Sequence, residues 1–174
     1  MEYRELRLEE AERIGEINAE QMIERAWREV DGVRQLVAIN WLERELPNGL
    51  EWHIARLKDS LANGGKAYGC FEEERLIGYV VIDGKLFGKA AHYILLDQLF
   101  ISLEYRGQGV GSALFRLCCE AAEHMKADKI YICAGSAEET IAFYFAIGCK
   151  KAEEVNQALY EGDPRDYQLE YILS

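Results

Sequence analysis

The sequence lacks the features of several large protein classes. Its 31 acidic residues outnumber its 20 basic residues and give a net charge of −11 at pH 7. This excess argues against a broad nucleic-acid surface, which needs clustered lysine and arginine. No apolar run approaches the roughly 18 residues of a membrane-spanning helix, and the acidic opening MEYRELRLEEAERI contains no apolar segment typical of a secretory signal. We therefore expect neither nucleic acid nor a membrane as a partner.

The cysteines follow no zinc-binding pattern. Their number is odd, and no C-x-x-C pair or matching histidine spacing occurs, so no metal site is expected. We interpret them as buried thiols of a protein in the reducing cytoplasm. A catalytic thiol is the alternative. The five are Cys70, Cys118, Cys119, Cys133 and Cys149.

The length suits one domain. A chain of 174 residues can bury one core but is too short for two ordinary domains. No serine, glycine or proline tract marks a linker, and no internal repeat occurs. We therefore predict a single domain spanning residues 1–174.

Hydrophobic periodicity predicts strands and helices in alternation. The segment HYILLDQLFI is apolar enough for a central strand, and helical spacing of apolar residues starts at Gly109. Ser136 and Glu139 have the spacing of a capping box for the next helix. This order indicates a mixed α/β sheet. The other predicted elements are strands in EYRELRL, up to Phe71, Leu76–Ile82, KIYICA and DYQLEYIL, and helices over about 9–30, 51–62 and 137–147.

The stretch EYRGQGVGSALF places three glycines where a helix follows the central strand. The first amides of a helix have no intrahelical partner, and glycines let a ligand approach the backbone closely. The loop therefore predicts a phosphate or pyrophosphate site, with a tight structural turn as the alternative. A Walker loop would need G-K-S/T, which is absent, and the dinucleotide fingerprint would need glycine where Ser112 stands.

These residues resemble the signature of the GNAT superfamily of acyl-CoA-dependent N-acetyltransferases, Gln/Arg-x-x-Gly-x-Gly/Ala after a central strand. Arg106, Gly109 and Gly111 fill the signature positions, and LFISLEYRGQGVGSALF is similar to the core motif from end to end. AFYFAIGCKKAEE is similar to a later helix of the family. The resemblance covers the C-terminal half of the chain. It implies a GNAT-like α/β fold with a mixed, mostly antiparallel sheet of six to seven strands flanked by helices.

The resemblance also implies acetyl-CoA as the cosubstrate. In the family, the loop amides hold the pyrophosphate, and the preceding strand offers backbone groups to the pantetheine arm and the thioester carbonyl. A splay between this strand and KIYICA admits that arm. The cofactor-binding residues implied here are Leu99, Phe100, Ile101, Arg106, Gly107, Gln108, Gly109, Val110, Gly111 and Ser112.

Tyr144 matches the tyrosine that the family places near the sulfur of CoA. A phenol with an ordinary pKa of about 10 stays protonated at neutral pH and can donate to the departing thiolate. The alternative is a core tyrosine, since Phe143 and Phe145 flank it.

Asp97 is the candidate base. An alkyl ammonium must lose a proton before attack, at a cost of about 4.6 kcal/mol at pH 7 for a pKa near 10.4. Asp97 interrupts an apolar strand, and the two-residue period predicts that it shares a face with Leu99 and Ile101. A structural salt bridge is the alternative role.

The resemblance has gaps, which leave other functions open. Ala137 stands where many members have a pantetheine-binding asparagine, and Ile132 where others have glutamate. We expect direct transfer of an acetyl group in a ternary complex to a primary amine, which the acidic surface suggests is small and cationic. The alternatives are a protein amine, a regulatory domain that binds acyl-CoA without turnover, and a thiol route through Cys133. Trp27, Trp41 and Trp52 are expected in a pocket or in the core, and a homodimer is possible.

Overall fold

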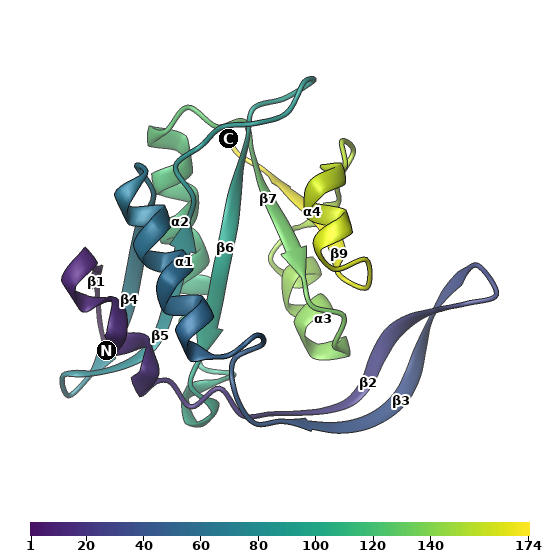
Figure 1. The fold of residues 1–174 in the computed structure, drawn as a ribbon, viewed down its shortest axis with the longest axis horizontal. Coiled ribbons are helices and arrows are strands. Elements are labelled where there is room, and N and C mark those ends of the chain that lie inside the picture. Colours follow the sequence, from purple (N-terminus) through teal and green to yellow (C-terminus); the bar gives the residue numbers. More distant parts are fainter.

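The computed structural model describes residues 1–174. Nine strands and four α-helices form the fold predicted from the resemblance: a seven-stranded, mostly antiparallel sheet in the order β1-β4-β5-β6-β7-β9-β8, flanked by helices (Figure 1). The strands are β1 (Glu2–Glu5), β2 (Gln21–Val30), β3 (Val33–Glu43), β4 (Lys66–Glu72), β5 (Arg75–Ile82), β6 (Tyr93–Ile101), β7 (Lys129–Ala134), β8 (Lys150–Lys151) and β9 (Tyr167–Ile172). The helices are α1 (Leu50–Ala62), α2 (Val110–His124), α3 (Glu138–Ala146) and α4 (Gln157–Gly162), with short 3-10 helices at Leu8–Glu16 and Leu103–Tyr105.

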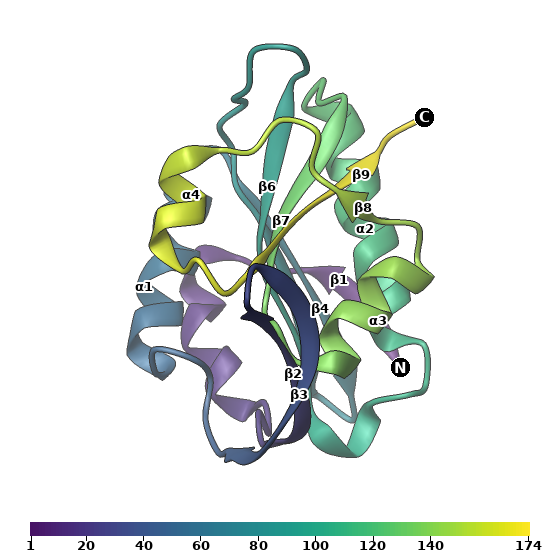
Figure 2. The same cartoon turned by 90° about the vertical axis from the view of Figure 1, so that its right-hand side faces the viewer.

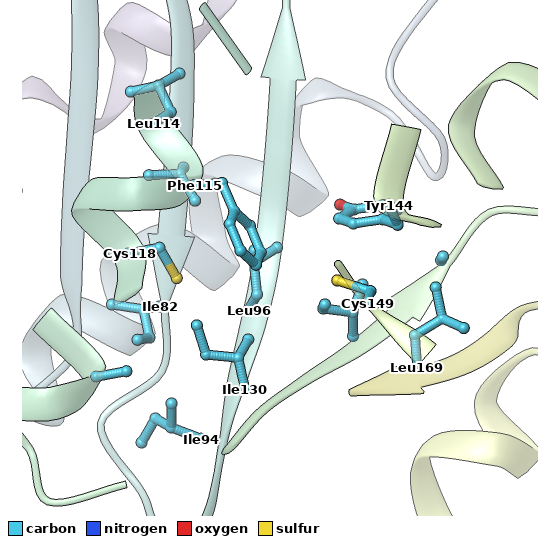
Figure 3. Packing of buried hydrophobic residues seen from close by; sticks show 14 of the residues in the cluster. Ile82, Ile94, Leu96, Leu114, Phe115, Cys118, Ile130, Tyr144, Cys149 and Leu169 are labelled. Carbon is cyan, nitrogen blue, oxygen red and sulfur yellow. The ribbon is translucent and has the colours of Figure 1, made fainter. Parts of the chain in front are cut away.

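The helices cover both faces of the sheet. Figure 2 shows α1 and α4 on one side of the sheet and α2 and α3 on the other. The larger core cluster joins α2 and α3 to the sheet through residues such as Leu96, Leu114 and Ile130 (Figure 3). A second cluster packs Ile54 and Leu57 of α1 on the opposite face. None of the helices is long and apolar enough to span a membrane.

The sheet opens in its centre. β6 and β7 pair in parallel only from Tyr93 with Lys129 to Leu96 with Ile132. Beyond Leu96 the two strands diverge, and Figure 1 shows the widening gap below their paired ends. The splay implied by the family resemblance is therefore confirmed.

The predicted helix over residues 9–30 is wrong. The 3-10 helix ends at Glu16, and Gln21–Val30 is a strand that pairs with Val33–Glu43 in a separate two-stranded sheet. Asp31 and Gly32, both at positive φ, form the turn between the strands. An Asp-Gly pair between two β-rich runs is a hairpin signal, and it carries more weight than the loose helical spacing of Ile14, Ile17 and Met22.

The predicted capping box is also not formed. Ala137 is the N-cap residue of α3, and no side chain caps this helix. The Ser136 hydroxyl instead accepts a hydrogen bond from Arg28 of β2 at 2.7 Å. A hydrogen bond with a residue distant in sequence has therefore replaced the predicted capping bond.

Glu170 joins three strands through a fully buried carboxylate. It accepts hydrogen bonds from the Tyr93 hydroxyl (2.6 Å) and the Glu153 amide (2.9 Å), and it pairs with Lys129 at 2.9 Å. We predict that Glu170→Gln lowers the free energy of unfolding by about 3 kcal/mol, because the buried charge of the pair is lost and Lys129 keeps only its longer contact with the exposed Glu153, at 3.4 Å. Urea unfolding measures this loss. Glu123→Gln, on an exposed face of α2, is the matched control, and equal midpoints for the two variants would contradict the assignment.

Candidate active site

The loop before α2 presents six consecutive backbone amides without a protein acceptor. None of the amides from Gly107 to Ser112 donates a hydrogen bond within the chain, and the first bond of the helix runs from Ala113 to the Gly109 carbonyl. Gly107 and Gly109 have φ angles of 75° and 85°, and a Cβ added at either would meet no atom within 4 Å. Unpaired amides at the positive end of a helix dipole, on an uncrowded backbone, fit an anionic diphosphate.

Arg106 holds this loop in place from inside. Its guanidinium donates to the carbonyls of Ile101 (2.9 Å), Glu20 (2.7 Å) and Asn18 (3.4 Å). Burial lowers the pKa of this guanidinium. The signature arginine therefore anchors the glycine loop to the end of β6.

The backbone of β6 lines the splay. The Ser102 amide donates to the Ile77 carbonyl of β5, so by the alternation of an antiparallel ladder Phe100 bonds toward β5. Leu99 and Ile101 then direct their backbone groups toward the open side. The Ile101 carbonyl already accepts the Arg106 bond, so Leu99 offers the freest backbone groups among the three predicted residues.

Tyr144 stands on the far side of the same opening. It is 6% exposed and packs in the larger core cluster. Figure 3 shows its hydroxyl directed from α3 toward β6. The hydroxyl makes no hydrogen bond within the chain, so its proton is not committed to a protein acceptor. Burial raises the pKa of Tyr144, which keeps the phenol protonated and able to donate.

The comparison with known proteins agrees with this geometry. Residues 22–148 match the model of the acetyltransferase (GNAT) family. The chain belongs to the GNAT family of acetyltransferases. It is thus an acyl-CoA-dependent acetyltransferase, and acetyl-CoA is its cosubstrate. No curated protein sequence matches the chain.

Several solved GNAT structures share the whole fold. A nourseothricin acetyltransferase has a TM-score of 0.75 at 17% identity, covering 99% of this chain and 98% of its own. A protein of Bacillus anthracis str. Ames assigned as a streptothricin acetyltransferase, in complex with acetyl coenzyme A, has a TM-score of 0.68 at 15% identity over 99% and 96%. The PaiA N-acetyltransferase of Thermoplasma acidophilum, in complex with coenzyme A, has a TM-score of 0.62 at 16% identity over 98% of each chain.

Asp97 lies on the other face of the sheet from the one predicted. β6 has a bulge there, because Gln98 pairs with Val81 while Leu96 pairs with Ile82, which leaves Asp97 as an extra residue. A bulge reverses the alternation beyond it. Leu99 and Ile101 therefore pack toward α2 and α3, whereas Asp97 faces α1.

The Asp97 carboxylate is fully engaged. Arg56 of α1 donates to both of its oxygens, at 3.1 and 2.5 Å, and Gln98 adds a longer bond at 3.4 Å. This pairing holds the pKa of Arg56 above its ordinary value. The side chain of Asp97 is 7% exposed, so the acid is an ion-paired group at the edge of the splay.

No sequence pattern marks Asp166, a further carboxylate beside Asp97 on the α1 and α4 face. It is half-buried, directly before β9, and its carboxylate has no hydrogen bond or ion pair. Burial, followed by the charge of Asp163, raises the pKa of Asp166 to about 7, against the opposing effect of Arg34. Only the folded arrangement of these residues leaves the carboxylate without a partner.

The thiol route through Cys133 finds no support. Burial, with Asp166 and Asp97 nearby, raises the pKa of Cys133 to about 12, so the thiolate nucleophile is scarce at neutral pH. His53 is buried, with Nε2 2.6 Å from the Pro47 carbonyl, and His92 is exposed at the far end of β6. Neither histidine lies beside the thiol.

The remaining predicted positions are also accounted for. Trp41 and Trp52 are 59% and 43% exposed, whereas Trp27 is partly buried and packs against the larger core cluster, 6.1 Å from the Tyr167 ring. Ala137 bridges to Ala26 of β2, and Ile132 is buried at the last β6–β7 pair. Neither residue brings a polar group to the splay.

We predict that Gly109→Glu abolishes binding of acetyl-CoA, because the new carboxylate would repel the diphosphate that we expect the loop amides to bind. Gly32→Glu is the matched control, since Gly32 has a φ of 78° and open space around it at the tip of the hairpin. Both variants bear the same backbone strain and the same charge. Isothermal titration calorimetry measures the binding, and retained affinity in Gly109→Glu would contradict the assignment of the loop.

Proposed function

We propose that this acetyltransferase moves an acetyl group to a primary amine of a small cationic molecule, by direct attack in a ternary complex. The observation that carries the proposal is the splay itself. The unpaired loop amides and the Tyr144 hydroxyl lie on the side of the splay that α2 and α3 cover. The carboxylates lie on the side that α1 and α4 cover. The donor and the amine are therefore expected to enter from opposite faces and to meet between β6 and β7.

The residues of this chain would act as follows. Acetyl-CoA supplies the acetyl group, activated as a thioester. The amides of Gly107 to Ser112 bind its diphosphate, and the Leu99 amide donates a hydrogen bond into the splay, as an oxyanion-type group does. Tyr144 holds a proton for the departing sulfur. Asp97, directly or through water, takes a proton from the amine.

A screen of amines tests this proposal. The panel holds alkyl amines, diamines, an aminoglycoside and a streptothricin-class antibiotic, since two proteins of the same fold carry names that point to such acceptors. Release of free thiol reports turnover. Tight binding of acetyl-CoA without thiol release from any amine or peptide would favour a regulatory acyl-CoA-binding domain instead.

Tyr144→Phe should lower kcat by about 10²-fold while the KM for acetyl-CoA changes little, because only the proton donor is removed. Phenylalanine keeps the ring that packs in the core. Phe143→Leu, a change in the neighbouring ring that keeps the hydroxyl, serves as the control. An unchanged kcat in Tyr144→Phe would remove the tyrosine from the mechanism.

Asp97→Asn and Arg56→Gln together separate a proton acceptor from a structural ion pair. If Asp97 accepts the proton, Asp97→Asn should lower kcat by about 10²-fold. Arg56→Gln keeps the carboxylate and should therefore retain most of the activity of the wild-type protein. Equal losses of kcat in the two variants would assign the ion pair a structural role.

A further inference from the structure

Two aspartates on the acceptor face differ in how their charge is balanced. Asp97 lies on β6 and Asp166 lies directly before β9, the two strands that flank β7, and both acids are near the Cys133 thiol of β7. Arg56 neutralises Asp97. Asp166 has no donor, although it is half-buried and the Gln168 side chain next along this face bonds only to Tyr131 and Cys133.

We propose that Asp166 is a specificity-determining residue of the acceptor site and binds a second cationic group, remote from the nitrogen that is acetylated. The preferred acceptor is therefore a diamine or a larger polycationic amine. This inference rests on the proposed function and adds to it the residue that selects the acceptor.

The two carboxylates suit two different nitrogens. The attacking nitrogen must be neutral, and an unpaired carboxylate beside it would stabilise the ammonium that cannot attack. At Asp97 the carboxylate is already paired with Arg56, so it does not stabilise the attacking nitrogen as an ammonium. A second ammonium takes no part in bond formation, so it can remain paired with Asp166. β9 lies two strands from β6, and β6 and β7 have diverged at Asp97, so the two sites lie farther apart than the roughly 10 Å that two paired strands at about 4.8 Å each would give.

Neighbouring groups hold Asp166 in position without occupying its carboxylate. Arg34 of β3 lies 3.9 Å from the centre of the Tyr167 ring and donates to the backbone carbonyls of Arg165 and Asp166. The Asp166 amide donates to the Asp163 carbonyl. The loop is therefore tied down through its backbone.

A buried donor on the same face also lacks a partner. The Nε2 of Gln168 has no acceptor, while its Oε1 accepts from the Tyr131 hydroxyl at 2.6 Å. The Tyr131 hydroxyl accepts from the Asn156 amide, so it must donate to Gln168, and this fixes the orientation of the amide. A buried amide donor without an acceptor is costly to the fold. The Gln168 amide group is thus held in a fixed orientation beside Asp166, with one donor left unpaired.

The protonation of Asp166 supports the same role. Its pKa of about 7 means that the folded protein favours the neutral acid, so ionisation at higher pH opposes folding. Asp163 raises this pKa, Arg34 lowers it, and Cys133 remains a neutral thiol. A charge that destabilises the fold is typical of a functional site.

Calorimetry on protein saturated with CoA tests the proposal directly, because CoA allows binding without turnover. The probes are 1,5-diaminopentane and pentylamine, which differ only in the second cation. At pH 8 we expect the diamine to bind about tenfold more tightly to the wild-type protein, and Asp166→Asn to abolish this preference. Asp128→Asn, at the opposite end of β7, is the matched control and should keep it. In turnover, Asp166→Asn should raise the KM for the diamine and leave kcat and the KM for pentylamine nearly unchanged.

The pH dependence gives an independent measurement. Both ammonium groups stay charged between pH 6 and 8, since their pKa lies near 10. The preference for the diamine should therefore rise with pH through about 7 in the wild-type protein, as Asp166 ionises. Asp163→Asn should move this rise to lower pH, because a like charge is removed while the Arg165 amide keeps an acceptor.

The outcomes separate the two proposals. A diamine preference that persists in Asp166→Asn, or that is independent of pH in the wild-type protein, overturns the role of Asp166 even if acetyl transfer is observed. Absence of acetyl transfer to every amine overturns the proposed function, while the calorimetric comparison still decides the binding role. We expect Asp166→Asn to be at least as stable as the wild-type protein at pH 8. If Asp166→Asn does not fold, the pH shift of the diamine preference in Asp163→Asn decides whether Asp166 binds the second cation.

Discussion

One extra residue in β6 sets the geometry of the active site. Without the bulge at Asp97, the two-residue period of β6 would continue from Leu96 and turn Gln98 and Phe100 into the core beside α2. With the bulge, Leu99 and Ile101 take those places, while Asp97 and Gln98 both face α1. The β6–β7 ladder ends one residue earlier, at Leu96. The strand therefore changes its register against the helices at the point where it leaves its parallel neighbour.

This change divides the site into two faces with different chemistry. The face with α2 and α3 offers mainly backbone groups, in the glycine loop and along β6, and backbone groups do not vary with the side chain. The face with α1 and α4 offers side chains, with Arg56 and Asp166 coming from separate segments. On the proposed assignment, substitutions on that face would alter acceptor choice without disturbing the loop that binds the diphosphate. A common acyl donor and variable acceptors are compatible with this division.

Elements governed by local pattern were predictable from the sequence. The spacing from Gly109 onward predicted α2, the apolar run predicted the central strand, and the glycines marked the loop whose amides have no protein acceptor. Features that depend on distant partners were missed. Predicting the bulge requires knowing which residues of β5 and β6 pair. Predicting β2 as a strand requires recognising β3 as its partner. Asp166 was missed because its significance is the absence of a partner in the folded chain.

The hairpin of β2 and β3 contacts the segments around β7 and β9. Its arginines lie over the end of β7 and the start of β9, where Arg25 contacts Glu138, Arg28 contacts Ser136 and Arg34 stacks on Tyr167. A two-stranded ribbon is marginally stable alone, so these contacts with the main sheet stabilise it. The Arg34 guanidinium stacks on an aromatic ring and donates to two backbone carbonyls, but it does not bond to the nearby Asp166 carboxylate. The positive charge of Arg34 thus lowers the free-energy cost of ionising Asp166, although the two side chains form no ion pair. The Asp166 carboxylate therefore remains available to a cation from solution.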